Sequence, residues 1–172
     1  MRLRFASMVM TAKVRHADAN AAVELREVAR YRVIYGDTDK MGFVYYGNYL
    51  RYFEIARNGF LRQASARYHA FEEQHGLMLP VVEAQIRYRR PARYDDELAI
   101  FAAIPEVRGA SARFAYEIRR LPDGEVLVDG YTVHACIDGE GRVSRIPTEL
   151  RTALGATNGS NGLPLPLRAP GT

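Results

Sequence analysis

Residues 36–54 read GDTDKMGFVYYGNYLRYFE, and this stretch decides the fold. Asp37 and Asp39 close an alternating apolar run, a glycine-bearing turn follows, and an amphipathic segment begins at Gly47 and Asn48. A carboxylate beside a helix N-terminus suits catalysis, because it can attack or deprotonate while free backbone N–H groups stabilise the anion that forms next to it. The stretch therefore predicts a strand, a turn with a candidate catalytic carboxylate, and a helix.

The hydrophobic pattern around this stretch predicts an α+β order. Residues 27–35 alternate as a strand, and residues 47–67 have helical spacing with an apolar stripe broad enough to predict a largely enclosed helix. One helix followed by several antiparallel strands allows a sheet of about five strands to wrap the helix. The later strands are predicted at 79–88, 97–107, 112–121 and 126–137, with breaks at 90–91, 108–109 and 122–124 and a short terminal helix opening at 147.

Length and composition fit one domain with tails. The chain has 172 residues, enough for a single sizeable core, and its 48% hydrophobic and 26% charged content is ordinary for a globular protein. Residues 1–24 are predicted as a flexible N-terminal tail and 25–155 as the folded domain. Residues 156–172 are rich in Gly, Pro, Asn and Ser and are predicted as a disordered C-terminal tail.

Charge and motif content exclude several classes of protein. The net charge of +4 fits either an anionic ligand or a basic surface, and no aromatic-basic repeat or helix-turn-helix pattern supports nucleic-acid binding. No apolar run approaches the ~20 residues of a membrane span. The short apolar run near the N-terminus is broken at Lys13, so we expect no signal peptide and a cytoplasmic protein. Cys136 is the only cysteine, which rules out an intrachain disulfide, and its alternating run predicts a small buried side chain.

The stretch also resembles the signature of the hotdog-fold acyl-CoA thioesterases of the 4-hydroxybenzoyl-CoA thioesterase type, a group that includes the Tol-Pal-associated thioesterases. The family pattern is Asp-x-Asp-x-x-Gly-x-Val-x-(Tyr/His)-x-Asn-Tyr, and the resemblance continues more loosely to about Leu154. It implies a hotdog fold, with a long central helix wrapped by an antiparallel sheet, and hydrolysis of an acyl-CoA to free acid and CoA. It implies no metal and no cofactor, since CoA is part of the substrate. The matching positions are Asp37, Asp39, Gly42, Val44, Tyr46, Asn48 and Tyr49.

The resemblance assigns the catalytic roles. Asp39 falls on the family's catalytic aspartate, and nucleophilic attack and activation of water both remain open for it. Tyr46 falls on the position whose backbone N–H, at the helix N-terminus, polarises the thioester oxygen. Tol-Pal-type relatives often carry His there, so Tyr46 moves the assignment away from a strict Tol-Pal type. The structural alternative is that Asp39 only caps a turn.

Supporting and substrate-binding roles follow for the neighbouring motif residues. Gly42 is expected to supply a backbone conformation closed to other residues beside the bound thioester, with Val44 in the same turn. Asn48 is expected to be an N-cap or an amide that pins the loop. Asp37 is expected to share a face with Asp39 and to stabilise the turn. Glu54 is expected to be solvated or paired with Arg51 or Asn58 at helical spacing, although a related branch uses a helix glutamate catalytically.

The negative charge of CoA requires basic residues near the site. Arg108 lies in a Val-Arg-Gly-Ala-Ser turn similar to the family's inter-strand loop, where nucleotide contacts occur, and Ser111 follows it. The resemblance further implies a homodimer or homotetramer with active sites between protomers. Two alternatives stay open: an acyl-ACP thioesterase, or a non-catalytic acyl-CoA-binding module on the same fold. Further basic candidates without motif support are Lys40, Arg89, Arg90 and Arg93.

Overall fold

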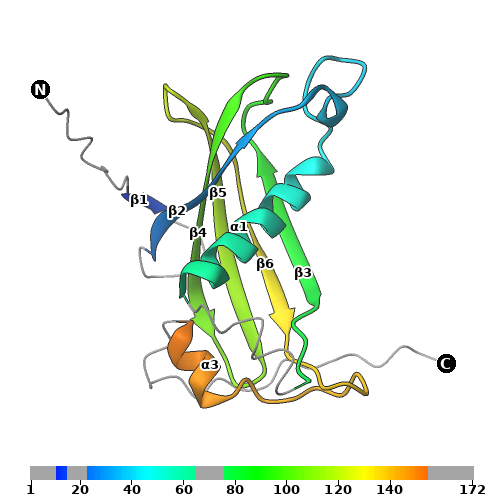
Figure 1. Cartoon of the computed structure of the whole chain (residues 1–172), viewed down its shortest axis with the longest axis vertical. Coiled ribbons are helices and arrows are strands. Elements are labelled where there is room, and N and C mark those ends of the chain that lie inside the picture. Colours follow the sequence, from blue (N-terminus) through cyan, green and yellow to red (C-terminus); the bar gives the residue numbers. More distant parts are fainter. Residues whose placement is uncertain (1–10, 15–22, 65–75, 155–172) are drawn as a thin grey trace, which may run out of the picture.

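A computed structural model describes residues 11–14, 23–64 and 76–154 of the chain. They form one antiparallel sheet of six strands in the order β1-β2-β4-β5-β6-β3, with helix α1 lying across one face (Figure 1). The strands are β1 (Thr11–Val14), β2 (Val23–Arg32), β3 (Val81–Tyr88), β4 (Glu97–Val107), β5 (Ser111–Leu121) and β6 (Glu125–Ala135). The helical elements are the 3-10 turn η1 (Tyr35–Asp37), α1 (Asn48–Ala64) and α3 (Thr148–Ala153).

The expected order of elements along the chain is confirmed, and the strand from 97 to 107 has the predicted bounds. The other strands differ from their predicted ends by a few residues, because hydrogen bonding to a neighbour, rather than alternation, decides where a strand stops. The sixth strand is β1, which lies inside the range predicted as an N-terminal tail. Residues 156–172, predicted as a C-terminal tail, lie outside the described residues.

Helix α1 packs on the sheet through residues at helical spacing. Tyr49, Tyr52, Phe53 and Ala56 are each at most 2% exposed, and the Phe53 ring stacks on Tyr116 of β5 at 4.4 Å between centroids. Side chains on the opposite side of the helix are exposed, so the helix is covered on one face and is less enclosed than its apolar pattern predicted. The sheet curves along the helix but leaves its outer side open (Figure 1).

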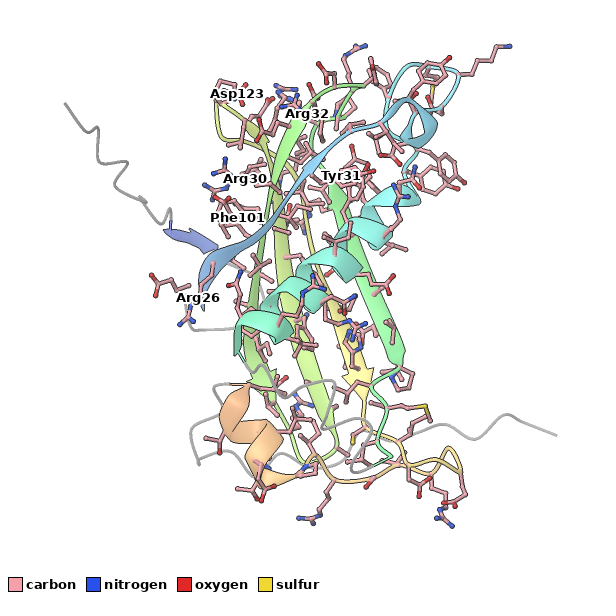
Figure 2. The ribbon with its side chains drawn as sticks, in the orientation of Figure 1. Arg26, Arg30, Tyr31, Arg32, Phe101 and Asp123 are labelled. Carbon is pink, nitrogen blue, oxygen red and sulfur yellow. The ribbon has the colours of Figure 1, made fainter. Side chains whose placement is uncertain are left out.

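A glycine allows the helix to approach the sheet closely. A Cβ atom built on Gly59 would lie 2.7 Å from the carbonyl oxygen of Val28 in β2, which no real side chain tolerates. The middle of α1 therefore lies directly against β2. Alternation along β2 separates the two faces of the sheet: Figure 2 shows Tyr31 on the side of α1, with Arg30 and Phe101 on the other side.

The two ends of the sheet carry different parts of the predicted site. One end of the sheet holds the pair formed by residue 97 of β4 and Leu121 of β5. The end of β3 lies there too, and its Tyr88 contacts the start of α1. The turn from Val107 to Ser111 marks the opposite end. A strand of 11 residues spans roughly 35 Å, so features at opposite ends are far apart within one chain.

Candidate functional site

The turn that carries Asp39 is closed by its own backbone. The Asp39 N–H donates to the carbonyl of Phe43 at 2.8 Å, and the Asp39 carbonyl accepts from the N–H of Gly42 at 2.9 Å. Oδ1 of Asp39 accepts the N–H of Met41 at 2.8 Å, as expected for a turn-capping aspartate. Within the described residues Oδ2 accepts no hydrogen bond, and the side chain is half-buried. The carboxylate is thus oriented by one oxygen and available through the other.

Gly42 has φ of +77°, in the left-handed region. The prediction that this position needs a conformation closed to other residues is confirmed. Val44, also predicted to contact substrate, is 4% exposed, and its N–H donates to the carbonyl of Ala92 at 2.9 Å. Its side chain belongs to the hydrophobic core and does not face a substrate position in this chain.

The first turn of α1 begins next to this carboxylate-bearing turn and presents free N–H groups. Within the described residues, the backbone N–H groups of Tyr46 and Gly47 have no acceptor. The Tyr46 carbonyl, in contrast, accepts the hydroxyl of Tyr88 at 3.2 Å and the N–H of Tyr49 at 3.4 Å. The Tyr46 side chain is 62% exposed. The Tyr46 carbonyl is therefore held from β3, while the N–H groups of Tyr46 and Gly47 stay open.

Asp37 is the most buried carboxylate of the motif, at 2% exposure. Its Oδ2 accepts the hydroxyl of Tyr31 at 2.6 Å, the hydroxyl of Tyr52 at 3.1 Å and the N–H of Ile34 at 3.3 Å, while Oδ1 pairs with the guanidinium of Arg51. Burial alone would raise the pKa of Asp37, but these hydrogen bonds and the ion pair outweigh it, and the pKa of the carboxyl is lowered. Asp37 is thus ionised and structural.

One expectation about this carboxylate is wrong. Asp37 and Asp39 do not share a face, because Asp37 lies in the 3-10 turn η1 and faces the core, whereas Asp39 is half-buried at the following turn. Arg51 turns toward the buried Asp37, and Glu54 is exposed, so of the two roles expected for Glu54 it has the solvated one. Within the described part of the chain, Glu54 has no ion pair.

The backbone of Asp37 joins the two halves of the site. Its carbonyl accepts the N–H of Tyr45 at 2.9 Å and the side-chain amide of Asn48 at 2.8 Å. Asn48 is the first residue of α1, so of its two predicted roles it has the one that pins the loop. These bonds fix the Asp39 turn against the start of the helix.

Arg108 and Ser111 lie at the other end of the sheet. The Arg108 N–H donates to the Ser111 carbonyl at 2.7 Å, and Nε of Arg108 donates to Glu106 at 2.8 Å. Both residues line a shallow depression of about 180 Å³ with Glu83 and Arg113. Within one chain they are not brought together with Asp39 and Tyr46, because β4 and β5 separate them by their full length.

A larger cavity of about 440 Å³ lies beside α1. One wall is the face of α1 that begins at Leu50, two residues after the helix starts at Asn48, and another is the start of β3 with the segment before it. Its floor is polar and comes from β5 and β6: Tyr116, Thr132 and His134 are at most 6% exposed. This cavity has the size of a small-molecule site.

The polar floor is a closed chain of hydrogen bonds. Nδ1 of His134 lies 2.8 Å from the carbonyl of Leu79, which can only accept, so Nδ1 carries the hydrogen. Burial lowers the pKa of His134, so the ring is neutral and Nε2 accepts the Thr132 hydroxyl at 2.8 Å. Thr132 in turn accepts the Tyr116 hydroxyl at 2.8 Å, and burial raises the pKa of Tyr116 to about 12. Every donor of the floor is used.

The remaining sequence predictions concern Cys136 and metals. Cys136 is fully buried, which confirms its assignment as a small core side chain, and burial raises the pKa of its thiol. Across residues 11–14, 23–64 and 76–154, no three His, Cys, Asp or Glu side chains gather as metal ligands. No helix in the same ranges has the length and apolar character needed to cross a membrane.

Several site residues were not found from the sequence. Tyr31 and Tyr52 could have been noticed, because alternation and helical spacing put their polar tips on core-facing positions. Arg51 and Tyr88 gave no such signal, since their partners are distant in the chain. The polar floor of the cavity was also missed, because it depends on contacts between β5, β6 and the segment before β3. The only local signal was the position of His134 in an alternating run.

Comparisons with known proteins match this arrangement. Residues 33–154 match the family model described as the thioesterase-like superfamily. The chain belongs to the thioesterase-like superfamily. As a member it is a thioester hydrolase with the hotdog fold, as the motif predicted.

Individual relatives agree with this family. The acyl-CoA thioesterase YbgC of Haemophilus influenzae is 34% identical over 124 residues, which covers 71% of this chain and 89% of that protein. The putative acyl-CoA thioesterase YneP of Bacillus subtilis is 32% identical over 108 residues, 63% of this chain and 77% of that one. Among solved structures, DHNA-CoA thioesterase from Staphylococcus aureus superposes with a TM-score of 0.67 at 25% identity, covering 74% of this chain and 87% of that one.

Proposed function

We propose that this thioester hydrolase acts on acyl-CoA, with Asp39 as nucleophile or general base and the backbone N–H of Tyr46 as oxyanion donor. The observation that carries the proposal is the free N–H of Tyr46, set beside a turn whose carboxylate keeps one oxygen unbonded. The names of the relatives in Haemophilus and Bacillus support acyl-CoA as the substrate.

The chemistry requires two groups on opposite sides of the thioester carbonyl. A donor at the helix N-terminus stabilises the negative charge that develops on the carbonyl oxygen. Asp39 either attacks the carbonyl carbon, releasing CoA thiolate and leaving a mixed anhydride that water cleaves, or it removes a proton from an attacking water. Both routes give free acid and CoA, and both use only protein groups and water.

Recognition of the CoA nucleotide by Arg108 and Ser111 requires a second copy of the chain. In one protomer these residues are at the opposite end of the sheet from Asp39. Strand β3 is an edge strand in the described sheet, and Val81 and Val82 are 56% and 54% exposed on it. Antiparallel pairing of two β3 edges would place the far end of one sheet beside the near end of the other. We infer a homodimer of this kind as the working unit.

The test of the proposal is the Asp39→Asn variant in a thiol-release assay with benzoyl, short-chain and long-chain acyl-CoAs. Loss of the nucleophile or base should lower kcat by well over tenfold while the fold, measured by circular dichroism, is kept. Glu140→Gln, an exposed carboxylate in a distant loop, is the matched control. If Asp39→Asn keeps more than about a tenth of the wild-type kcat, a barrier change below ~1.4 kcal/mol, Asp39 is not the catalytic group.

The same panel separates the alternatives. Faster release from acyl-ACP than from acyl-CoA with the same acyl group would favour an acyl-ACP thioesterase. Binding of acyl-CoA without any thiol release would favour a non-catalytic module.

A further inference from the structure

The last residue of the family motif, Tyr49, has no part in the chemistry proposed above. It lies in the first turn of α1 and is 2% exposed, although its side chain ends in a hydroxyl. That hydroxyl accepts the backbone N–H of Ala92 at 2.9 Å. Burial raises the pKa of Tyr49, so the hydroxyl stays protonated at neutral pH. The motif therefore ends on a buried hydroxyl that binds the loop between β3 and β4, residues 89–96 (the β3–β4 loop).

The middle of the β3–β4 loop supports the Asp39 turn at two points. The carbonyl of Ala92 accepts the N–H of Val44 at 2.9 Å, where the chain leaves the turn. The guanidinium of Arg93 lies 4.5 Å from the centre of the Phe43 ring, and the Phe43 carbonyl accepts the N–H of Asp39. The Ala92 peptide is thus bound by the helix through its N–H and by the end of the Asp39 turn through its carbonyl.

Both ends of the β3–β4 loop are fixed to the sheet. At its start, the N–H of Arg89 donates to the carbonyl of Leu127 at 2.9 Å. At its end, the carbonyl of Asp96 accepts the N–H of Val33 at 3.0 Å. Ala92 lies between these anchors, and its N–H has the hydroxyl of the helix as its acceptor. Removal of that hydroxyl therefore frees the middle of the loop, where it supports the candidate catalytic turn, and leaves the ends in place.

The ring of Tyr49 reaches the other half of the site. It packs edge-on against Tyr88, with 5.6 Å between the ring centroids. The hydroxyl of Tyr88 donates to the carbonyl of Tyr46 and so holds the peptide next to the free N–H groups. One buried side chain thus contacts the support of the carboxylate through its hydroxyl and the support of the oxyanion donor through its ring.

We propose, on the basis of the proposed function, that Tyr49 is a positioning residue whose hydroxyl sets the place of the Asp39 carboxylate relative to the N–H of Tyr46. It acts through the backbone of Ala92 and Val44. A displacement of reacting groups by about 1 Å can cost roughly a hundredfold in rate, so one buried hydrogen bond behind the turn is enough to affect turnover. The CoA contacts proposed at the other end of the sheet do not involve this link, so KM should change little.

The first measurement is steady-state thiol release by Tyr49→Phe, which keeps the ring and removes the hydroxyl. With the best acyl-CoA of the panel, kcat should fall about tenfold while KM changes by less than about twofold. Tyr94→Phe is the matched control, because it lies in the same loop, is exposed, and its hydroxyl bonds to no residue that the structure describes. Arg93→Met, an exposed site whose change leaves the core intact, should lower kcat several-fold by removing the contact with Phe43.

A double-mutant cycle separates positioning of Asp39 from a general loss of structure. Tyr49→Phe added to Asp39→Asn should change the residual kcat by less than about twofold, because the hydroxyl acts through the group already removed. Amide hydrogen exchange tests the link without any turnover. In Tyr49→Phe the protection of the Ala92 and Val44 amides should fall by about tenfold or more, while amides of β4 and β5 keep theirs.

Three results would overturn the inference: a wild-type kcat in Tyr49→Phe, an equal loss of kcat with and without the Asp39 carboxylate, or unchanged protection of the two amides. Thermal melting checks that each variant is folded. Full activity of Asp39→Asn refutes the proposed function whatever Tyr49→Phe does. A normal kcat in Tyr49→Phe beside an inactive Asp39→Asn refutes this inference and leaves the proposed function standing.

Discussion

The side-chain amide of Asn48 donates a 2.8 Å hydrogen bond to the main-chain carbonyl of Asp37, which joins the first residue of α1 to the turn that carries Asp39. The carboxylate of Asp37 is in turn buried under Tyr31, Tyr52 and Arg51. Asp37 thus connects the Asp39 turn to the start of α1 through its carbonyl, and it is anchored in the core through its carboxylate. The free N–H of Tyr46 and the Asp39 carboxylate are both positioned by this link.

Asn48→Ala should lower kcat by about tenfold with a smaller change in KM. The amide does not contact the substrate, but without it the Asp39 turn and the oxyanion donor lose their fixed spacing, and small displacements of reacting groups are costly. Steady-state kinetics with an accepted acyl-CoA provide the measurement. Asn58→Ala, on the same helix and without a hydrogen bond to a described residue, is the control. Equal losses in the two variants would contradict a positioning role for Asn48.

Asp37→Asn should lower the free energy of unfolding at pH 7 by roughly 2 kcal/mol, since the buried carboxylate accepts several hydrogen bonds and pairs with Arg51. The folded pKa of Asp37 lies below its unfolded value of about 3.9. The stabilisation is therefore complete above that unfolded value and is lost as the pH falls through the folded pKa. Urea unfolding of both proteins should show the difference shrinking below about pH 4. A difference constant down to pH 2 would show that the charge is not its source.

Tyr46→Phe should keep most of the activity, because the backbone N–H that serves as donor is unchanged and the side chain is exposed. Tyr88→Phe should reduce kcat by several-fold, because it removes the hydroxyl that holds the Tyr46 carbonyl at 3.2 Å. Both variants are compared by kcat at saturating substrate. If Tyr46→Phe is as inactive as Asp39→Asn, the hydroxyl participates and the backbone assignment is incomplete.

Arg108→Ala should raise KM for acyl-CoA several-fold and change kcat less, because nucleotide contacts are similar in the ground and transition states. An exposed ion contact is worth up to about 1 kcal/mol and is screened by salt, so the effect should shrink at high ionic strength. A truncated thioester without the nucleotide is the control substrate. An equal loss with that substrate would mean that the Arg108 turn supports the fold and does not bind the ligand.

Val82→Lys should shift the oligomer toward monomer and lower activity together. The side chain lies on the exposed edge strand β3, and a charge there opposes edge-to-edge pairing. Light scattering after size-exclusion chromatography gives the mass, and the thiol-release assay gives the activity. Val143→Lys, an exposed valine in a loop, is the control. A dimer of unchanged stability would exclude β3 as the interface.

The sequence by itself determined the order of elements and the place of the catalytic turn. Period-two and helical spacing are local properties, so they located β3 to β6 and α1 to within a few residues. The run from Asp37 to Tyr49 identified the family because its residue types and spacing are specific. The conformation of Gly42 was also predictable, since a tight turn beside a motif favours a residue without a side chain.

Only the tertiary structure decided how the parts of the site relate. Burial under two tyrosines and an arginine made Asp37 a structural group, and no local pattern places Arg51 or Tyr52 beside it. The length of β4 and β5 put Arg108 at the far end of the sheet from Asp39, although both belonged to the same predicted site. The cavity beside α1 exists only because residues of β3, β5 and β6 are brought against the helix. These relations depend on contacts between residues distant in sequence, which periodicity and spacing do not encode.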